Sequence, residues 1–116
     1  METLEYTEKG KVITVLLEGS INITNVEQIE EQISALMGKK PKVVGLDCNE
    51  LKYIDSSAIA VFVKLLKNSM TMGIKLIFFN LNSEIEQTFH VIKLSSFFKI
   101  MSKDQFDKEY GSGFVF

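Results

Sequence analysis

Apolar residues alternate with polar ones, or gather in short runs, along five stretches of the chain, and both patterns are typical of strands. Leu4 and Tyr6 alternate with polar neighbours, which predicts a half-buried strand over residues 3–7. Lys9-Gly10 then supplies a tight reversal into the apolar run 12–17, so these two segments are predicted to form an antiparallel hairpin. Three later runs predict further strands: residues 42–47, 74–79 and 97–101.

Helical spacing of apolar residues fills the stretches between these strands, and it predicts four amphipathic helices. Each predicted helix has polar residues suited to its start: Thr24 with Glu27, Asp55 or Ser56, Ser83 with Glu86, and Ser102 with Gln105. The predicted apolar faces are Val26, Ile29, Ile33 and Leu36/Met37; Ile59, Phe62/Val63, Leu66 and Met70; Ile85, Phe89 and Ile92; and Phe106 with Tyr110. The second helix is so apolar that we expect it to be largely buried.

Strands and helices alternate after the opening hairpin, in the order β-β-α-β-α-β-α-(β)-α. This order predicts an α/β fold with a mixed sheet of four or five strands and about four helices packed on it. Right-handed crossovers would make the later strands parallel. The length of 116 residues predicts a single domain over residues 1–116.

The composition is that of an ordinary globular protein, with 46% hydrophobic and 24% charged residues. Cys48 stands alone, which excludes an intramolecular disulfide and favours a reducing compartment. The start of the chain lacks the basic and apolar pattern of a signal peptide, and no apolar run approaches the ~20 residues of a membrane span. We therefore expect a cytoplasmic protein without membrane insertion.

The charge pattern argues against direct nucleic-acid binding. The net charge is −2, and the 13 basic residues are spread along the chain without a dense patch that aromatic residues interleave. The chain also has no Trp to serve as a stacking platform.

Common catalytic motifs are missing from the sequence. Neither glycine-rich nucleotide loop occurs, nor does a GxSxG nucleophile elbow. His90 and Cys48 give no cluster of metal ligands, so no metal or cofactor is expected. Cys48 is predicted to be a small buried hydrophobe. A small α/β enzyme that uses Asp55, Ser57 and His90 is an alternative, although their spacing does not support it.

Asp55-Ser56-Ser57-Ala58 places a carboxylate and two hydroxyls where the second, apolar helix begins. Asp and Ser are favoured helix caps, so capping alone accounts for these residue types. A helix start also presents unpaired N–H groups to a phosphate. The stretch follows a predicted strand, and Gly19-Ser20-Ile21-Asn22 follows another, so both are expected at the edge where sites gather in open α/β sheets.

These segments carry a resemblance to a known family. Gly19-Ser20-Ile21-Asn22, the run 43–47 and the stretch Leu51-Lys52-Tyr53-Ile54-Asp55-Ser56-Ser57-Ala58 resemble a STAS domain of the anti-sigma factor antagonist type. The likeness extends over about residues 3–110 and includes Gly73-Ile74-Lys75-Leu76 and the stretch 94–100.

The resemblance implies a binding protein rather than an enzyme, and it implies the STAS fold. In this family the unphosphorylated antagonist binds an anti-sigma factor that is also a serine kinase, which frees the sigma factor for transcription. The kinase phosphorylates the first serine after the motif aspartate and so abolishes binding, and a phosphatase, of the PP2C type, restores it. The matching phosphoacceptor here is Ser56, with Ser57 as second choice. The implied partner-binding residues are Asn22, Thr24, Asp55, Ser56, Ser57 and Ala58.

Two departures from the family pattern keep an alternative open. Ala58 stands where the family has glycine, and Asn22 stands where it has an acid. The alternative is a STAS interaction module that is not phosphorylated, in a signalling scaffold or a transport complex.

We expect a monomer or weak dimer. The terminal Phe114-Val115-Phe116 is expected to pack back on the fold or to contact a partner or a second copy.

Overall fold

Five strands form one mixed sheet in the computed structural model, which describes residues 3–111. The strands are β1 (Tyr6–Lys9), β2 (Val12–Ile21), β3 (Val43–Ile54), β4 (Lys75–Phe79) and β5 (Lys99–Met101), and they lie in the order β1-β2-β3-β4-β5. β1 pairs with β2 in antiparallel fashion, and all other neighbours are parallel. The predicted mixed sheet with an opening hairpin is therefore confirmed.

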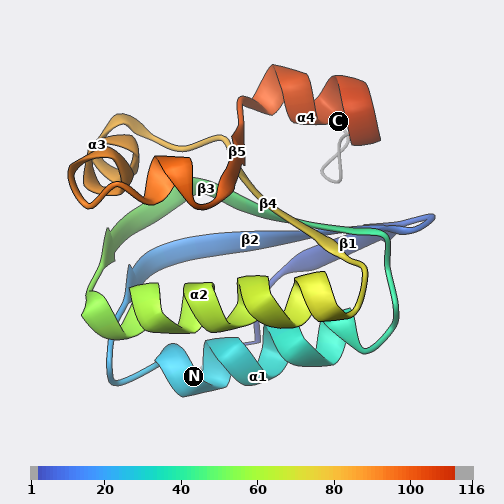
Figure 1. The fold of residues 1–116 in the computed structure, drawn as a ribbon, viewed down its shortest axis with the longest axis horizontal. Helices are drawn as coiled ribbons and strands as arrows, with labels where there is room; N and C mark the ends of the chain where they lie inside the picture. The colour runs from blue at the N-terminus through green and yellow to red at the C-terminus, as the bar shows by residue number, and fades with distance from the viewer. Residues whose placement is uncertain (1–2, 112–116) are drawn as a thin grey trace.

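Four α-helices pack around this sheet (Figure 1). They are α1 (Val26–Met37), α2 (Ser56–Thr71), α3 (Ser83–Val91) and α4 (Lys103–Tyr110), and a short 3₁₀ helix, η1 (Leu94–Ser96), precedes β5. α1 and α2 lie side by side against one face of the sheet, and α4 covers part of the other face (Figure 1). α3 and η1 lie together at the end of the sheet where β3 and β4 finish (Figure 1).

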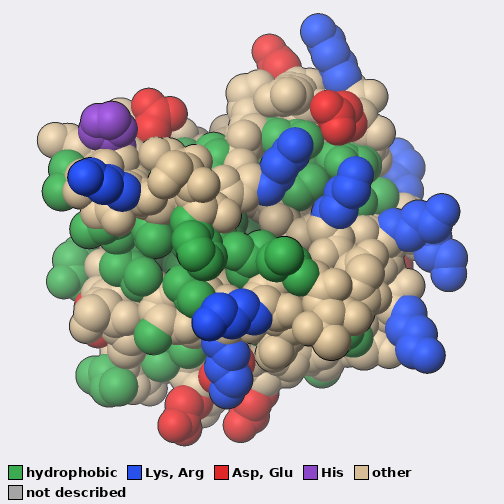
Figure 2. Space-filling model, viewed as in Figure 1, with side chains coloured by type: hydrophobic (Ala, Val, Ile, Leu, Met, Phe, Trp, Pro, Cys, Tyr) green, Lys and Arg blue, Asp and Glu red, His purple; other side chains and the backbone are tan. Residues whose placement is uncertain are grey.

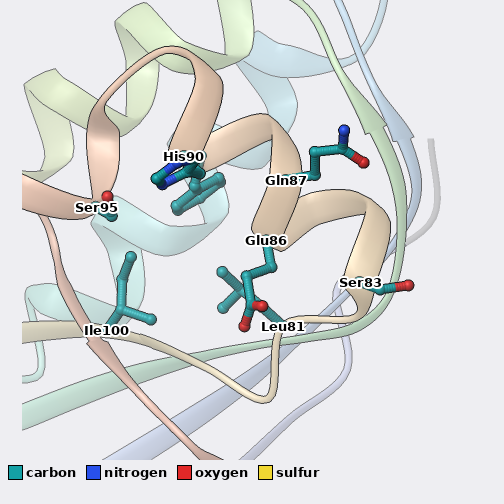
Figure 3. A pocket seen from close by; sticks show the side chains of 8 residues that line it. Leu81, Ser83, Glu86, Gln87, His90, Ser95 and Ile100 are labelled. Atoms are coloured by element: carbon teal, nitrogen blue, oxygen red, sulfur yellow. The ribbon is translucent and has the colours of Figure 1, made fainter.

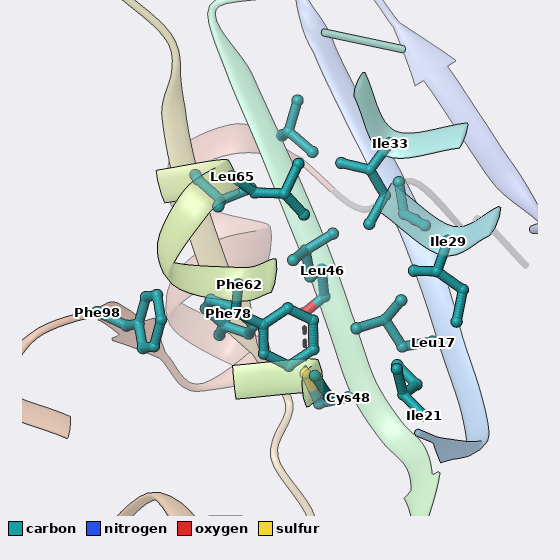
Figure 4. Close-up of a cluster of buried hydrophobic side chains, with 14 of the residues drawn as sticks. Leu17, Ile21, Ile29, Ile33, Leu46, Cys48, Phe62, Leu65, Phe78 and Phe98 are labelled. Atoms are coloured by element: carbon teal, nitrogen blue, oxygen red, sulfur yellow. Dashed lines mark hydrogen bonds between the residues drawn. The ribbon is translucent and has the colours of Figure 1, made fainter. Parts of the chain in front are cut away.

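Alternation along β4 divides the core between the two faces. Phe78 points to the α2 side, where its ring packs edge-on against Phe62 at 5.1 Å and Phe98 at 4.8 Å between centroids (Figure 4). Phe79 points to the opposite face and stacks on Phe106 of α4 at 4.0 Å. Gly45 of β3 makes room for that stack, because a Cβ there would lie only 2.7 Å from Cε2 of Phe106.

β2 and β3 are both longer than the apolar runs predict. The runs end at residues 17 and 47, whereas the strands continue to Ile21 and Ile54. Register shifts after Leu16 and Gly19 let the two strands stay paired with each other through this polar stretch. The extension depends on backbone pairing, which a hydrophobic pattern does not report.

The buried stripe of α2 also differs from the prediction. Ala58, Phe62, Leu65 and Ser69 face the core, whereas Met70, predicted to be on the apolar face, is 70% exposed. The helix lies in an outer layer beside α1, so only one stripe of it can meet the sheet. The expectation of a largely buried helix is therefore wrong, and α2 leaves apolar surface exposed.

Helix caps follow the prediction at two of the four helices. Asp55 caps α2, and Ser102 caps α4 by accepting the Gln105 N–H at 3.1 Å. α1 begins one residue later than predicted, after Asn25, because the loop carbonyl of Asn22 already accepts the N–H groups of Asn25 and Val26. α3 is capped by Asn82 rather than by the predicted Ser83. The predicted strand 97–101 is shorter in the structure, where β5 begins at Lys99, because the N–H groups of Phe97 and Phe98 donate to the Leu94 carbonyl of η1. Ile92 is exposed rather than part of the apolar face of α3.

Candidate functional site

The start of α2 and the loop that follows β2 meet at one edge of the sheet. The Asp55 N–H donates to the Ile21 carbonyl at 3.3 Å, and Asp55 Oδ2 accepts the N–H of Ile23 at 3.2 Å. Two stretches that are 32 residues apart are thereby joined through one carboxylate. The sequence prediction that they share an edge is confirmed.

The Asp55 carboxylate accepts hydrogen bonds both from the start of α2 and from the loop after β2. Its Oδ1 accepts the Ser57 hydroxyl at 2.6 Å and the Ala58 N–H at 3.0 Å, which caps α2. The Ser57 hydroxyl, followed by the Ala58 N–H, lowers the pKa of the Asp55 carboxyl from its ordinary value. Asp55 is therefore ionised at neutral pH, and it holds the helix start and the loop in one geometry.

The two adjacent serines have different surroundings. Ser57 is half-buried, and its hydroxyl donates to Asp55. Ser56 is exposed at the first position of α2, and within residues 3–111 its hydroxyl makes no hydrogen bond. An approaching partner or enzyme can thus reach Ser56 without breaking a contact of the fold.

Asn22 and Thr24 shape the loop beside these serines. Asn22 Oδ1 accepts both the N–H of Thr24 at 2.9 Å and its hydroxyl at 2.5 Å. Asn25 holds the same loop from the other side, because its side chain accepts the Asn22 N–H and donates to the Ser20 carbonyl. Thr24 is exposed and does not cap α1, contrary to the prediction. Its role in the structure is to close a turn that displays the loop.

Ala58 is the one predicted contact residue that the structure removes from the surface. Its side chain is completely buried on the core-facing side of α2. The methyl group fits this position because the start of α2 packs closely on the core there. A partner can therefore sense Ala58 only through the shape of the first helical turn.

Two exposed hydrophobic residues flank the site and were missed from the sequence. Ile23 is 73% exposed in the loop next to Asp55, and Tyr53 is 58% exposed on β3, paired with Ser20 of β2. A large apolar residue within the polar run Asn22-Ile23-Thr24 was the available signal for the first of them. Exposed apolar side chains with polar residues around them are typical of protein-binding surfaces.

This edge of the sheet is acidic. Its segments are residues 18–25, 47–56 and 80–84, which contain one lysine, Lys52. Their acids are Glu18, Asp47, Glu50, Asp55 and Glu84. A negative group added here meets more negative than positive charge.

His90 does not join Asp55 and Ser57. It is exposed on α3, where it lines a hollow of about 460 Å³ with Glu86 and Ser95 (Figure 3). No hydrogen bond among residues 3–111 connects His90 to Asp55 or Ser57, so the trio of the enzyme alternative is not assembled in that part of the chain.

Cys48 is fully buried, as predicted, and burial followed by the Asp47 charge raises the pKa of its thiol. The described residues hold no group of three or more His, Cys, Asp or Glu side chains placed to bind a metal ion. Within residues 3–111, the helices are all too short or too polar to cross a membrane. The predicted contacts of Phe114-Val115-Phe116 lie outside the described residues.

This chain is similar in sequence to known proteins and similar in fold to solved structures. Residues 3–105 match the family model of the STAS domain. The anti-sigma-B factor antagonist of Listeria monocytogenes is 25% identical over 88 residues, which cover 76% of this chain and 77% of that protein. The Thermotoga maritima protein TM1081 has a TM-score of 0.81 at 19% identity, over 96% of this chain and 90% of that one. The anti-sigma factor antagonist SpoIIAA in its unphosphorylated form has a TM-score of 0.70 at 16% identity, over 94% and 99% of the two chains.

Proposed function

Because the chain belongs to the STAS domain family, we propose that it is an anti-sigma factor antagonist. In this proposal it binds an anti-sigma factor and so frees a sigma factor for transcription. The name of the Listeria monocytogenes relative supports this role. The site supports it as well, because it offers a contact surface and no assembled catalytic group.

The proposed binding surface is the acidic edge around the start of α2. It comprises Asn22, Ile23, Thr24, Tyr53, Asp55, Ser56 and Ser57. Ile23 and Tyr53 would supply apolar contact area, and the polar residues would supply hydrogen bonds around it. Since this edge carries five acids and one lysine, a complementary partner surface is basic.

Ser56 is the proposed switch, with Ser57 as the less suitable choice. The observation that carries this proposal is a difference between the two hydroxyls. The Ser56 hydroxyl is exposed and makes no hydrogen bond within residues 3–111, whereas the Ser57 hydroxyl donates to Asp55 at 2.6 Å. The proposed modifying enzyme is the anti-sigma factor itself, acting as a serine kinase, and a phosphatase would reverse the step. The solved structure of SpoIIAA in its phosphorylated form, which has a TM-score of 0.68 with this chain, supports this proposal.

Phosphorylation would act at the interface without refolding the domain. A phosphate adds about −1.5 to −2 charges and three acceptor oxygens, here next to the Asp55 carboxylate. The exposed N-terminal turn of α2 can tolerate that charge, because a helix start favours anions. A partner would have to desolvate the phosphate, so affinity falls by about two orders of magnitude or more.

The decisive experiment measures binding of the cognate anti-sigma factor by calorimetry for matched variants. Ser56→Asp is expected to weaken binding about 100-fold, whereas Ser56→Ala keeps it. Ser34→Asp is the control, because Ser34 is an exposed serine of α1 that lies with Thr71 and Met72 near the other end of α2. It adds the same charge to the protein away from the proposed surface.

A second measurement tests the modification directly. Incubation with the cognate kinase and ATP is expected to add one phosphate, which mass spectrometry places on Ser56. Equal binding by wild type and Ser56→Asp, with no phosphate added, would refute the switch. That result would favour the constitutive STAS interaction module, to which the replacement of an acid by Asn22 also points.

A further inference from the structure

The edge of the sheet opposite Ser56 is strongly basic. It is formed by residues 8–12, 38–43, 72–75 and 97–99, which lead into the four parallel strands, and we call it the basic edge. Glu8 is the one acid in these segments. The lysines, all exposed, are Lys9, Lys11, Lys39, Lys40, Lys42, Lys75 and Lys99.

Three of these lysines lie side by side at the start of neighbouring strands. The Lys42 N–H donates to the Lys11 carbonyl at 2.8 Å, and the Lys75 N–H donates to the Lys42 carbonyl at 2.9 Å. Neighbouring strands are about 4.8 Å apart, so the backbones of these three lysines lie within roughly 10 Å along one edge, with Lys75 in register with Val43. Lys11 and Lys42 directly precede the register pair Val12–Val43, and like charges opposite each other on adjacent strands are destabilising, so the stability of the sheet does not explain this pair.

Little within the described chain neutralises the basic edge. Lys39 pairs with Glu8 at 3.1 Å, and its ammonium lies 5.5 Å from the centre of the Tyr6 ring. The other ion pairs of residues 3–111 are Lys64–Glu30 and Lys103–Asp107, which involve no lysine of this edge. Figure 2 shows Lys side chains along the right margin of the molecule, where the strands of Figure 1 begin, and red side chains mainly elsewhere.

Exposed methionines accompany the lysines at this end. Met70 is 70% exposed, and Met72 is 46% exposed, where α2 ends. Met70 lines a hollow of about 250 Å³ together with Ile74, Lys75 and Lys99. The methionine side chains can insert among the lipid acyl chains just below the headgroups, while the lysine ammonium groups stay at the level of the polar headgroups.

We propose that the basic edge docks on the surface of an anionic phospholipid bilayer. Clusters of four to eight lysines are typical of surfaces that adsorb to acidic lipids, and each contributes to the attraction over a Debye length. The residue types favour lipid over nucleic acid. The basic residues are lysines throughout the chain, with no arginine for bidentate contacts to phosphates or bases.

Docking in this orientation leaves the Ser56 edge exposed. α2 has 16 residues and spans roughly 24 Å between Ser56 and its end near the basic edge. The acidic edge would then point away from the similarly charged bilayer. Lipid binding and partner binding use separate surfaces, so either can fail without the other.

The test is co-sedimentation with vesicles of equal parts phosphatidylglycerol and phosphatidylcholine, compared with phosphatidylcholine alone. The protein is expected to sediment with the anionic vesicles alone and to dissociate as salt is raised. Lys42→Gln with Lys75→Gln is expected to bind roughly 30-fold more weakly. The matched control is Lys52→Gln with Lys93→Gln, two exposed lysines outside the basic edge, and it is expected to bind like wild type.

A further variant and a competing ligand test whether the partner is an anionic lipid surface. Met70→Gln is expected to weaken vesicle binding several-fold and to leave its salt dependence unchanged, because Met70 adds apolar contact rather than charge. Circular dichroism verifies that each variant is folded. Equal loss in both lysine pairs would overturn the proposal, as would equal sedimentation with neutral vesicles. Tighter binding to duplex DNA than to anionic vesicles at the same salt would also overturn it and would assign the edge to nucleic acid.

Discussion

Asn82 joins α3 to the polar half of β3, and replacing it should separate two contributions to stability. Its Oδ1 accepts the Ile85 N–H at 3.0 Å and caps α3. Its Nδ2 lies within hydrogen-bonding distance of three β3 carbonyls, those of Cys48 at 3.3 Å, Asn49 at 3.0 Å and Leu51 at 2.6 Å. An amide has two N–H hydrogens, so two of these three contacts are strong at any moment.

The expected cost of Asn82→Ala follows from these contacts. Loss of the cap costs about 1 kcal/mol, and loss of two hydrogen bonds to partly buried carbonyls costs about 1 kcal/mol each. The sum is about 3 kcal/mol, out of a total stability of roughly 5–15 kcal/mol for a domain. Asn82→Asp keeps the capping oxygen but loses both donors and turns an acceptor toward the carbonyls. It is therefore expected to cost at least about 2 kcal/mol, although Asp caps helices as well as Asn does.

Urea unfolding followed by circular dichroism measures these differences. With a slope of about 1.5 kcal/mol per molar urea, Asn82→Ala should lower the midpoint by roughly 2 M. Ser83→Ala is the control, because the exposed Ser83 was the cap predicted from the sequence, and its loss should change stability by less than about 0.5 kcal/mol. The reasoning is refuted if Asn82→Asp is as stable as wild type, since Asn82 would then act as a helix cap alone.

Three further predictions concern Asp55, Cys48 and Gly45. The pKa of Asp55 is lowered in the folded state, so the stability that its carboxylate contributes is present above its unfolded pKa of about 3.9 and is lost as the pH falls through the lower, folded value. The difference in unfolding free energy between wild type and Asp55→Asn should therefore shrink below about pH 4, and a constant difference would contradict this. The buried Cys48 thiol, whose pKa is raised, should react with a disulfide reagent at once in urea and slowly in native buffer, and rapid stoichiometric labelling of the native protein would show that the site opens. Gly45→Ala would place a Cβ 2.7 Å from Phe106 Cε2, so thermal unfolding should reveal a loss of about 1–3 kcal/mol, which Phe106→Leu in the same chain should partly reverse.

Local patterns in the sequence were sufficient for much of the fold and for the centre of the site. The apolar face of α1 is buried at the predicted positions, because a helical period needs only one packing surface to be satisfied. Asp55 caps α2 as expected, since capping involves residues that are neighbours in the chain. The resemblance already implied Ser56 rather than Ser57, but the physical difference between them needed coordinates, because it depends on which hydroxyl donates to the Asp55 carboxylate.

Sequence by itself determined the order of strands and helices and the opening hairpin, because periodicity, turns and caps are encoded within a few residues of one another. The resemblance to a family, and not these local patterns, implied Ser56 as the phosphoacceptor. Tertiary structure decided which side of α2 is buried, how far β3 continues through its polar half and that Asn82 rather than Ser83 begins α3. It also decided the distribution of charge. Lysines that are scattered along the sequence gather at one edge because parallel strands all begin there, and acids gather where the same strands end.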